Sequence, residues 1–270
     1  MVPLVALVAL VIGSPQAGLD DWNLLSSGSP PASIRRCLGH TAKVYEVRLT
    51  STGTLNVEEG PLAASNQHVV LPPSAVSLPR DTQSHSIDVG GGWLVGFDAG
   101  EFGGGLWWVD TDGRRGSIAL DGVPAWARNV HALMAWPTGA LAFVGLAHLS
   151  ADYGAVFRCF RENGRWTARL VSETDGAPTA AARAPDGGAV FVTGQGVGTV
   201  TTSGVVKTVL RSNFADLYPG SIVVDCSGTV FVGMRSVVIR LPRGATQEDW
   251  LVPPGCHRVE LVGTQCECRP

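Results

Sequence analysis

The stretch that decides the fold is Gly228-Thr229-Val230-Phe231-Val232-Gly233, a glycine followed by alternating β-forming residues. The chain carries the same phrase at three earlier places, which begin at Gly92, Gly139 and Gly188. The leading glycines follow one another at intervals of about 40 to 50 residues, a period typical of the blades of repetitive β-sheet proteins. The period of the repeat therefore limits the possible folds, independently of the role of any single residue.

Each copy belongs to a larger unit, seen most clearly in residues 219–256. Short runs of β-forming residues occupy 221–225, 229–233, 236–241 and 250–252, and Gly, Pro or Asp residues separate them. The units that cover 86–120, 132–172 and 180–210 divide in the same way, with a glycine in the turn after each third run. Four strands of about five residues per unit predict an all-β protein, a β-propeller of four-stranded antiparallel blades.

The segment from Pro219 to Gly233 resembles the NHL and sensor-type propeller repeats, which write Pro-x-x-Ile-x-Val-Asp-x-x-Gly-x-Val-x-Val once per blade. The segment from Pro178 to Gly194 is similar, although Ala180-Ala181-Ala182 replaces the strand residues. The Asn-His-Leu element that names the NHL family is absent from all four copies. The resemblance covers roughly residues 86–256 and implies the fold alone, because the matched positions are structural.

Both chain ends are expected to complete the ring. Residues 43–50 and 54–58 read as a hairpin that supplies outer strands of a further blade, and residues 257–262 read as one of its inner strands. We therefore predict five blades, within a range of four to six, in one domain over residues 37–270. Residues 19–36 are expected to be a linker.

The first residues favour export. Residues 2–12 are wholly apolar, too few to span a bilayer as a helix, and small residues follow them. Residues 1–18 are therefore predicted to be a signal peptide, although no basic residue precedes the apolar run. The alternative is a first core strand. A signal peptide implies a periplasmic or secreted protein.

Cysteine usage agrees with export. The tail cysteines are expected to form disulfides, with Cys37 brought near them where the ring closes; the set is Cys37, Cys256, Cys266 and Cys268. A zinc site is the alternative, but the tail lacks the two-residue gap typical of zinc ligands and has only His257 beside it. We expect no metal. Cys159 and Cys226 are expected to be buried free thiols.

Composition and motifs exclude several function classes. The net charge of −3 over 270 residues lacks the basic footprint of a nucleic-acid-binding protein. No Gly-x-Ser-x-Gly, His-Glu-x-x-His or dinucleotide-binding motif occurs, so neither catalytic residues nor a cofactor are assigned from motifs.

Candidate site residues cluster where strands end. Glu101 and Trp107 lie in a glycine-rich stretch, 98–108, which reads either as a recognition surface or as a bulge that glycine permits. Trp126, Arg128 and His131 are expected at one mouth of the ring.

His148 lies in what reads as the longest interstrand loop, residues 147–154. We expect non-catalytic binding of a protein or glycan partner in the cell envelope, including inhibition of the immunity type. The alternatives are a propeller lyase or hydrolase that uses His131 or His148 with Glu101, and a structural envelope component.

Overall fold

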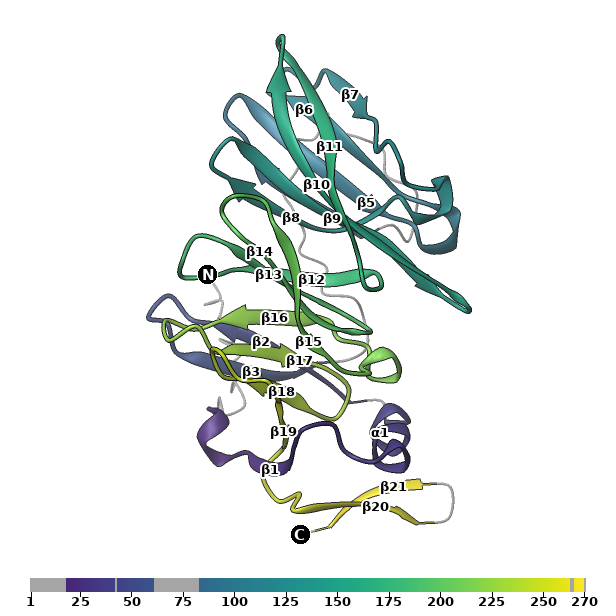
Figure 1. Ribbon diagram of the computed structural model, residues 1–270, viewed down its shortest axis with the longest axis vertical. Coiled ribbons are helices and arrows are strands. Elements are labelled where there is room, and N and C mark those ends of the chain that lie inside the picture. The colour runs from purple at the N-terminus through teal and green to yellow at the C-terminus, as the bar shows by residue number, and fades with distance from the viewer. Residues whose placement is uncertain (1–17, 42, 61–82, 263–264, 270) are drawn as a thin grey trace, which may run out of the picture.

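The computed structural model of the chain describes residues 18–41, 43–60, 83–262 and 265–269 (Figure 1). The predicted signal peptide lies almost wholly outside these ranges. Within them, helical structure is confined to α1 (Ala32–Gly39) and the four short turns η1 (Leu19–Asp21), η2 (Gly100–Phe102), η3 (Ala125–Ala127) and η4 (Ala215–Leu217). None of the described helices is long and apolar enough to cross a membrane.

Four antiparallel sheets confirm the predicted blades. Blade 1 contains β4 (Gln83–Asp88), β5 (Gly92–Asp98), β6 (Gly105–Asp110) and β7 (Arg115–Ile118). Blade 2 contains β8 (Asn129–Trp136), β9 (Gly139–His148), β10 (Ala151–Glu162) and β11 (Arg165–Thr174). Blade 3 contains β12 (Pro178–Arg183), β13 (Ala189–Thr193), β14 (Gly196–Val200) and β15 (Val206–Arg211). Blade 4 contains β16 (Ser221–Val224), β17 (Val230–Gly233), β18 (Val238–Leu241) and β19 (Asp249–Val252).

The glycine in the turn after each third strand is required by backbone geometry. Gly113, Gly164, Gly204 and Gly244 have φ of +80°, +77°, +86° and +76°. Residues with a Cβ rarely adopt this left-handed conformation, whereas glycine adopts it at little cost. The repeated turn glycine is therefore a reliable sequence mark of the third hairpin in each blade.

Apolar side chains between successive blades form the core. The first strands contact one another in the order β4, β8, β12, β16. Figure 1 shows β8, β12 and β16 following one another along the molecule. Leu94 of blade 1 and Phe157 of blade 2 belong to one buried cluster. Phe143 of blade 2 and Phe191 of blade 3 meet in the next cluster, with ring centroids 5.7 Å apart. Burial of side chains of this size stabilises the fold by about 1.5–3 kcal/mol each, so blade stacking is the main source of stability.

The ends of the chain differ from the prediction. Residues 19–36 are not a linker: β1 (Asn23–Ser27) pairs with β19 as a fifth strand of blade 4, and α1 follows it. The hairpin of β2 (Val44–Leu49) and β3 (Leu55–Gly60) is a separate two-stranded sheet that packs on β16 and β17 through β2. The strand β20 (Arg258–Val262) pairs with β21 (Gln265–Arg269) instead of joining that hairpin. Five four-stranded blades are therefore not confirmed.

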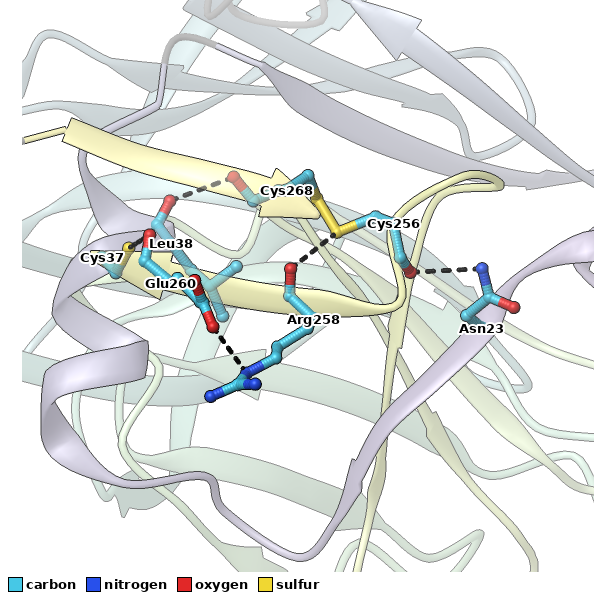
Figure 2. The surroundings of a disulfide bond; sticks show 8 residues. Asn23, Cys37, Leu38, Cys256, Arg258, Glu260 and Cys268 are labelled. Atoms are coloured by element: carbon cyan, nitrogen blue, oxygen red, sulfur yellow. Dashed lines mark hydrogen bonds and ion pairs between the residues drawn. A yellow bond between two sulfur atoms is a disulfide. The ribbon is translucent and has the colours of Figure 1, made fainter. Parts of the chain in front are cut away.

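Two disulfides hold the C-terminal hairpin in place. Cys37 of α1 is bonded to Cys266, which confirms the predicted link between Cys37 and the tail. Figure 2 shows the second bond, Cys256–Cys268, with the Asn23 side chain donating to the Cys256 carbonyl over 3.1 Å. The hairpin is thus attached both to the N-terminal segment and to the end of blade 4.

The two remaining cysteines are free but differ in exposure. Cys159 is buried as predicted, and burial raises the pKa of its thiol to about 12. Cys226 lies exposed in the turn between β16 and β17, so the prediction of a buried thiol is wrong there. The strand β16 ends at Val224, and the Asp225 carboxylate accepts from the Ser227 N–H over 2.9 Å, so Cys226 lies within the turn and outside the core.

Replacing both Cys37 and Cys266 by serine removes a bond between residues 229 positions apart. We expect the free energy of unfolding to fall by about 2–5 kcal/mol, because the unfolded chain regains the freedom of a long loop. Denaturant unfolding measures the loss. The exposed free thiol supplies the control, Cys226→Ser, which is expected to unfold like the wild type. A double variant as stable as that control would contradict the assigned role of the bond.

Candidate functional site

One face of the propeller carries the links between the second and third strands of each blade and the links between blades. On it η2, η3 and the end of β9 contact one another. Their meeting brings the Glu101 carboxylate within 3.2 Å of His148, measured from Oε2 to Nε2. Both side chains are exposed, and they come from adjacent blades. The contact joins two of the predicted site residues.

Hydrogen bonds of neighbouring residues fix the loop that carries Glu101. The Asp98 carboxylate accepts from the Gly100 N–H over 2.9 Å. Asn129, which is fully buried, accepts from the Ala99 N–H over 3.1 Å and donates to the Gly100 carbonyl over 2.9 Å. The loop is thus held by Asp98 and Asn129, which leaves the Glu101 carboxylate free to reach His148.

The glycine run in this loop has a structural explanation. A Cβ at Gly104 would lie 2.8 Å from the Asn129 Cα and also clash with the Phe97 carbonyl. Only glycine allows the loop to approach the start of blade 2 this closely. The glycine at 104 therefore serves close packing, the pairing of β5 with β6 contains no bulge, and the Glu101 side chain is exposed.

His131 lies within β8, the first strand of blade 2. Its Nδ1 is 3.1 Å from an Asp98 carboxylate oxygen and its Nε2 is 3.0 Å from the Gly145 carbonyl. Both ring nitrogens therefore face acceptor oxygens, and neither is free to take a proton from a bound molecule. His131 and Glu101 do not form the predicted pair; Asp98 takes the place of Glu101.

The Asp98–His131 pair also affects His85 on β4. Burial, followed by the charge of His131, lowers the pKa of the His85 imidazole, and Asp98 opposes this only in part. Burial alone would raise the pKa of the Asp98 carboxyl, but the hydrogen bond and charge of His131, the Gly100 N–H and the charge of His85 lower it overall. The three residues form one electrostatic unit on the inner strands of blades 1 and 2.

The remaining predicted residues separate into two groups. Trp126 of η3 is 42 % exposed and meets Tyr153 edge-on, with ring centroids 6.2 Å apart. Arg128 donates from Nε to the Val123 carbonyl over 3.2 Å and so braces the link between blades. Trp107 lies elsewhere, packed against a cluster that includes Val95 on the face of blade 1 away from blade 2.

Two exposed apolar residues were missed by sequence reasoning. Phe102 is 87 % exposed and follows Glu101, and Leu149 is 95 % exposed and follows His148. Leu149 lies at the tip of a tight hairpin, because β9 and β10 remain paired as far as His148 and Ala151. The predicted long loop at 147–154 is therefore wrong. We call Glu101, Phe102, Trp126, His148 and Leu149 the loop patch.

One sequence signal could have found the ion pair. Glu101 and His148 each lie nine residues after the leading glycine of their repeat, Gly92 and Gly139. Equivalent positions in adjacent blades are neighbours around a propeller. Among the described residues, no group of three or more His, Cys, Asp or Glu side chains is arranged to hold a metal ion.

No protein-family model and no curated protein matches the chain. Among solved structures, a gluconolactonase from Xanthomonas campestris is 10 % identical, with a TM-score of 0.45 and 92 % of each chain covered. The calcium-binding protein regucalcin from Agrobacterium tumefaciens is 16 % identical, with a TM-score of 0.45, and the match covers 92 % of this chain and 83 % of that one.

A streptogramin B lyase is 14 % identical, with a TM-score of 0.40, 62 % of this chain and 58 % of that chain covered. The chain thus spans less than two thirds of the lyase. Likenesses of this strength transfer no activity, and the assignment of a β-propeller rests on the four stacked blades themselves.

The lowered pKa values of His85 and Asp98 predict how stability depends on pH. The unfolded state binds protons more tightly at both sites, so stability increases with pH. The contribution of His85 is complete above its ordinary pKa of 6.5 and declines as pH falls below that value. The contribution of Asp98 is lost as the pH falls below 3.8.

Thermal unfolding from pH 8 to pH 5 is expected to show a decline in stability for the wild type and a flatter profile for His85→Gln. The exposed His257→Gln is the control and is expected to decline like the wild type; equal slopes in all three proteins would refute the prediction.

Proposed function

We propose that the protein is a non-catalytic binding propeller that holds a partner at the loop patch. The observation that carries the proposal is the exposure of Phe102, Trp126 and Leu149 around the Glu101–His148 pair. Large apolar side chains in the open cost free energy unless a partner covers them, and aromatic anchors with a polar rim are typical of protein interfaces.

The chemistry of the loop patch favours a protein over a glycan. Trp126 and Tyr153 meet at an interplanar angle of 73°, so they do not form one flat platform on which a sugar ring could stack. Phe102 and Leu149 offer no hydrogen bonds to sugar hydroxyls. Both suit an apolar contact on a folded partner, and the Glu101–His148 pair suits the polar groups at its rim.

The proposal places the protein outside the cytosol, in the periplasm or medium. Two disulfides support this, since such bonds persist in oxidising compartments. In its most specific form, the partner is an exported toxin or cell-wall hydrolase whose active site the loop patch covers, as an immunity-type inhibitor does. A rigid scaffold that displays a small apolar surface supports this role.

The test is comparative capture from the envelope fraction of the producing organism. The double variant Phe102→Ser/Leu149→Ser is expected to lose a protein that the wild type retains, because the apolar anchors are gone. The matched control is Val205→Ser/Val209→Ser, which removes two residues that are 48 % and 45 % exposed in blade 3. The control should capture as the wild type does.

Equal capture by all three proteins would contradict the loop patch as the binding site. A glycan array tests whether the partner is a glycan instead of a protein. Specific glycan binding that the double variant loses would replace a protein partner by a glycan.

A second candidate function is enzymatic, and the Glu101–His148 pair favours it. A carboxylate and an imidazole 3.2 Å apart on an accessible surface can move a proton to or from a bound molecule. Of the predicted histidines, His148 fits this role and His131 does not, because both nitrogens of His131 are occupied.

Assays against ester, lactone and glycoside panels separate the two functions. Any genuine turnover is expected to fall by about 100-fold or more in His148→Gln, the usual contribution of general acid–base catalysis. His257→Gln is the control for loss of an exposed histidine. Turnover unaffected by His148→Gln, or no turnover at all, would rule out this role for the pair.

A further inference from the structure

A row of arginines lies on blades 2 and 3, along the part of the strands that leads away from the loop patch. Arg158 of β10, Arg165 and Arg169 of β11, and Arg183 of β12 make up this arginine row. All four are exposed. The pairing of β10 with β11 puts the first three on one face of blade 2, since Arg158 is opposite Arg169 and Glu162 is opposite Arg165.

Aromatic rings orient the guanidinium groups. The Phe160 ring lies between two of them, 5.9 Å from Arg158 and 5.1 Å from Arg169. The guanidinium of Arg183 lies 5.9 Å from the Trp136 ring of the neighbouring blade. A guanidinium held against a ring keeps its N–H donors free at the edge, where they can bind oxyanions.

Two hydrogen bonds near the turn between β8 and β9 anchor arginines of the row from both blades. Arg183 donates to the Ala135 carbonyl at the end of β8. Arg158 donates to the Thr138 hydroxyl in the turn that follows. The two arginines, from different blades, thus donate to residues at the same end of blade 2, on either side of Trp136 and Pro137.

The charge of the row is not neutralised by the described protein. Among residues 18–41, 43–60, 83–262 and 265–269, none of the four arginines forms an ion pair. Glu162 faces Arg165 across the hairpin without an ion pair. Like charges directly opposite on a sheet are destabilising, so the Arg158–Arg169 pair lowers the stability of the hairpin and favours the binding of an anion beside it.

We propose that the arginine row binds an anionic polysaccharide through its sulfate or carboxylate groups. The guanidinium fork matches the geometry of both groups. The row is open and spans two blades, which suits successive groups along a polymer better than a single enclosed ion. The overall charge of −3 means that the chain as a whole does not attract anions, so binding would depend on local groups of cations such as this row.

Two other polyanions fit less well. A nucleic acid strand needs free aromatic faces on which bases stack, and here Phe160 and Trp136 are covered by guanidiniums. A bilayer surface needs exposed apolar side chains beside the cations. Of the exposed large apolar residues described in the chain, Leu170 adjoins the row in sequence, but it pairs with Phe157 and so lies on the other face of the hairpin from Arg169.

The experiment measures binding of the full chain to dextran sulfate by titration calorimetry, with neutral dextran as the uncharged comparison. The wild type is expected to bind dextran sulfate only, and the dissociation constant is expected to rise as salt is added. The variant Arg158→Gln/Arg169→Gln should weaken binding by roughly tenfold or more, because charge-assisted hydrogen bonds are lost. The control Arg36→Gln/Arg243→Gln makes the same change in net charge at exposed arginines outside the row and should bind as the wild type does.

Three outcomes would overturn the inference. Equal weakening in the control would show that net charge alone attracts the polymer. Equal binding of neutral dextran would exclude recognition of the anionic groups. Tighter binding of an oligonucleotide or of anionic phospholipid vesicles, if it is lost in Arg158→Gln/Arg169→Gln, would assign the surface to another ligand class.

Thermal unfolding of each variant checks that it is folded. Removing the repulsion between Arg158 and Arg169 is expected to raise the stability, which gives an independent measure of the row.

Discussion

The structure depends on one constraint, that both faces of every four-stranded sheet are apolar and need cover. In β9 this is seen at successive residues, since Ala142 and Phe143 point to opposite faces and both are fully buried. Ala142 belongs to the cluster shared with blade 1, and Phe143 belongs to the cluster shared with blade 3. A single sheet of this kind cannot exist in water, so the blades fold as a stack in which each covers its neighbour.

The stack also explains where binding surfaces can arise. Stability comes from the contacts between blades, which leaves the loops at either end of the strands free to carry exposed or charged groups. At one end Asn129 and Asp98 hold a loop that displays Glu101 and Phe102. At the other end Phe160 holds two arginines at the surface. Both surfaces involve neighbouring blades, so both exist only while the stack is intact.

The sequence predicted the blades well because their rules are local. Alternation, turn glycines and a regular period gave all the strands of the four blades, with boundaries shifted by a few residues. The ends were harder, because β1 joins β19 and β20 joins β21 through contacts that no periodic pattern marks. Nothing in residues 19–36 distinguishes an edge strand from a linker until its partner is known.

The site was predictable in its region and not in its pairings. Glu101 and His148 were both candidates, yet their contact depends on how two adjacent blades are set against each other. His131, expected at the mouth of the ring, lies within β8, and its partner is Asp98 at the end of β5. Phe102 and Leu149 were missed because exposure of an apolar residue is a property of the packed structure, and composition does not reveal it.

The most direct test of blade stacking is a double-mutant cycle between Phe143 of blade 2 and Phe191 of blade 3, each replaced by leucine. Their rings lie 5.7 Å apart, and such a pair is expected to show a coupling energy of about 0.5–1.5 kcal/mol in denaturant unfolding. The same cycle between Phe143 and Phe231 of blade 4, which belong to different buried clusters, is expected to show none. No coupling between Phe143 and Phe191 would contradict the stack on which both proposed surfaces depend.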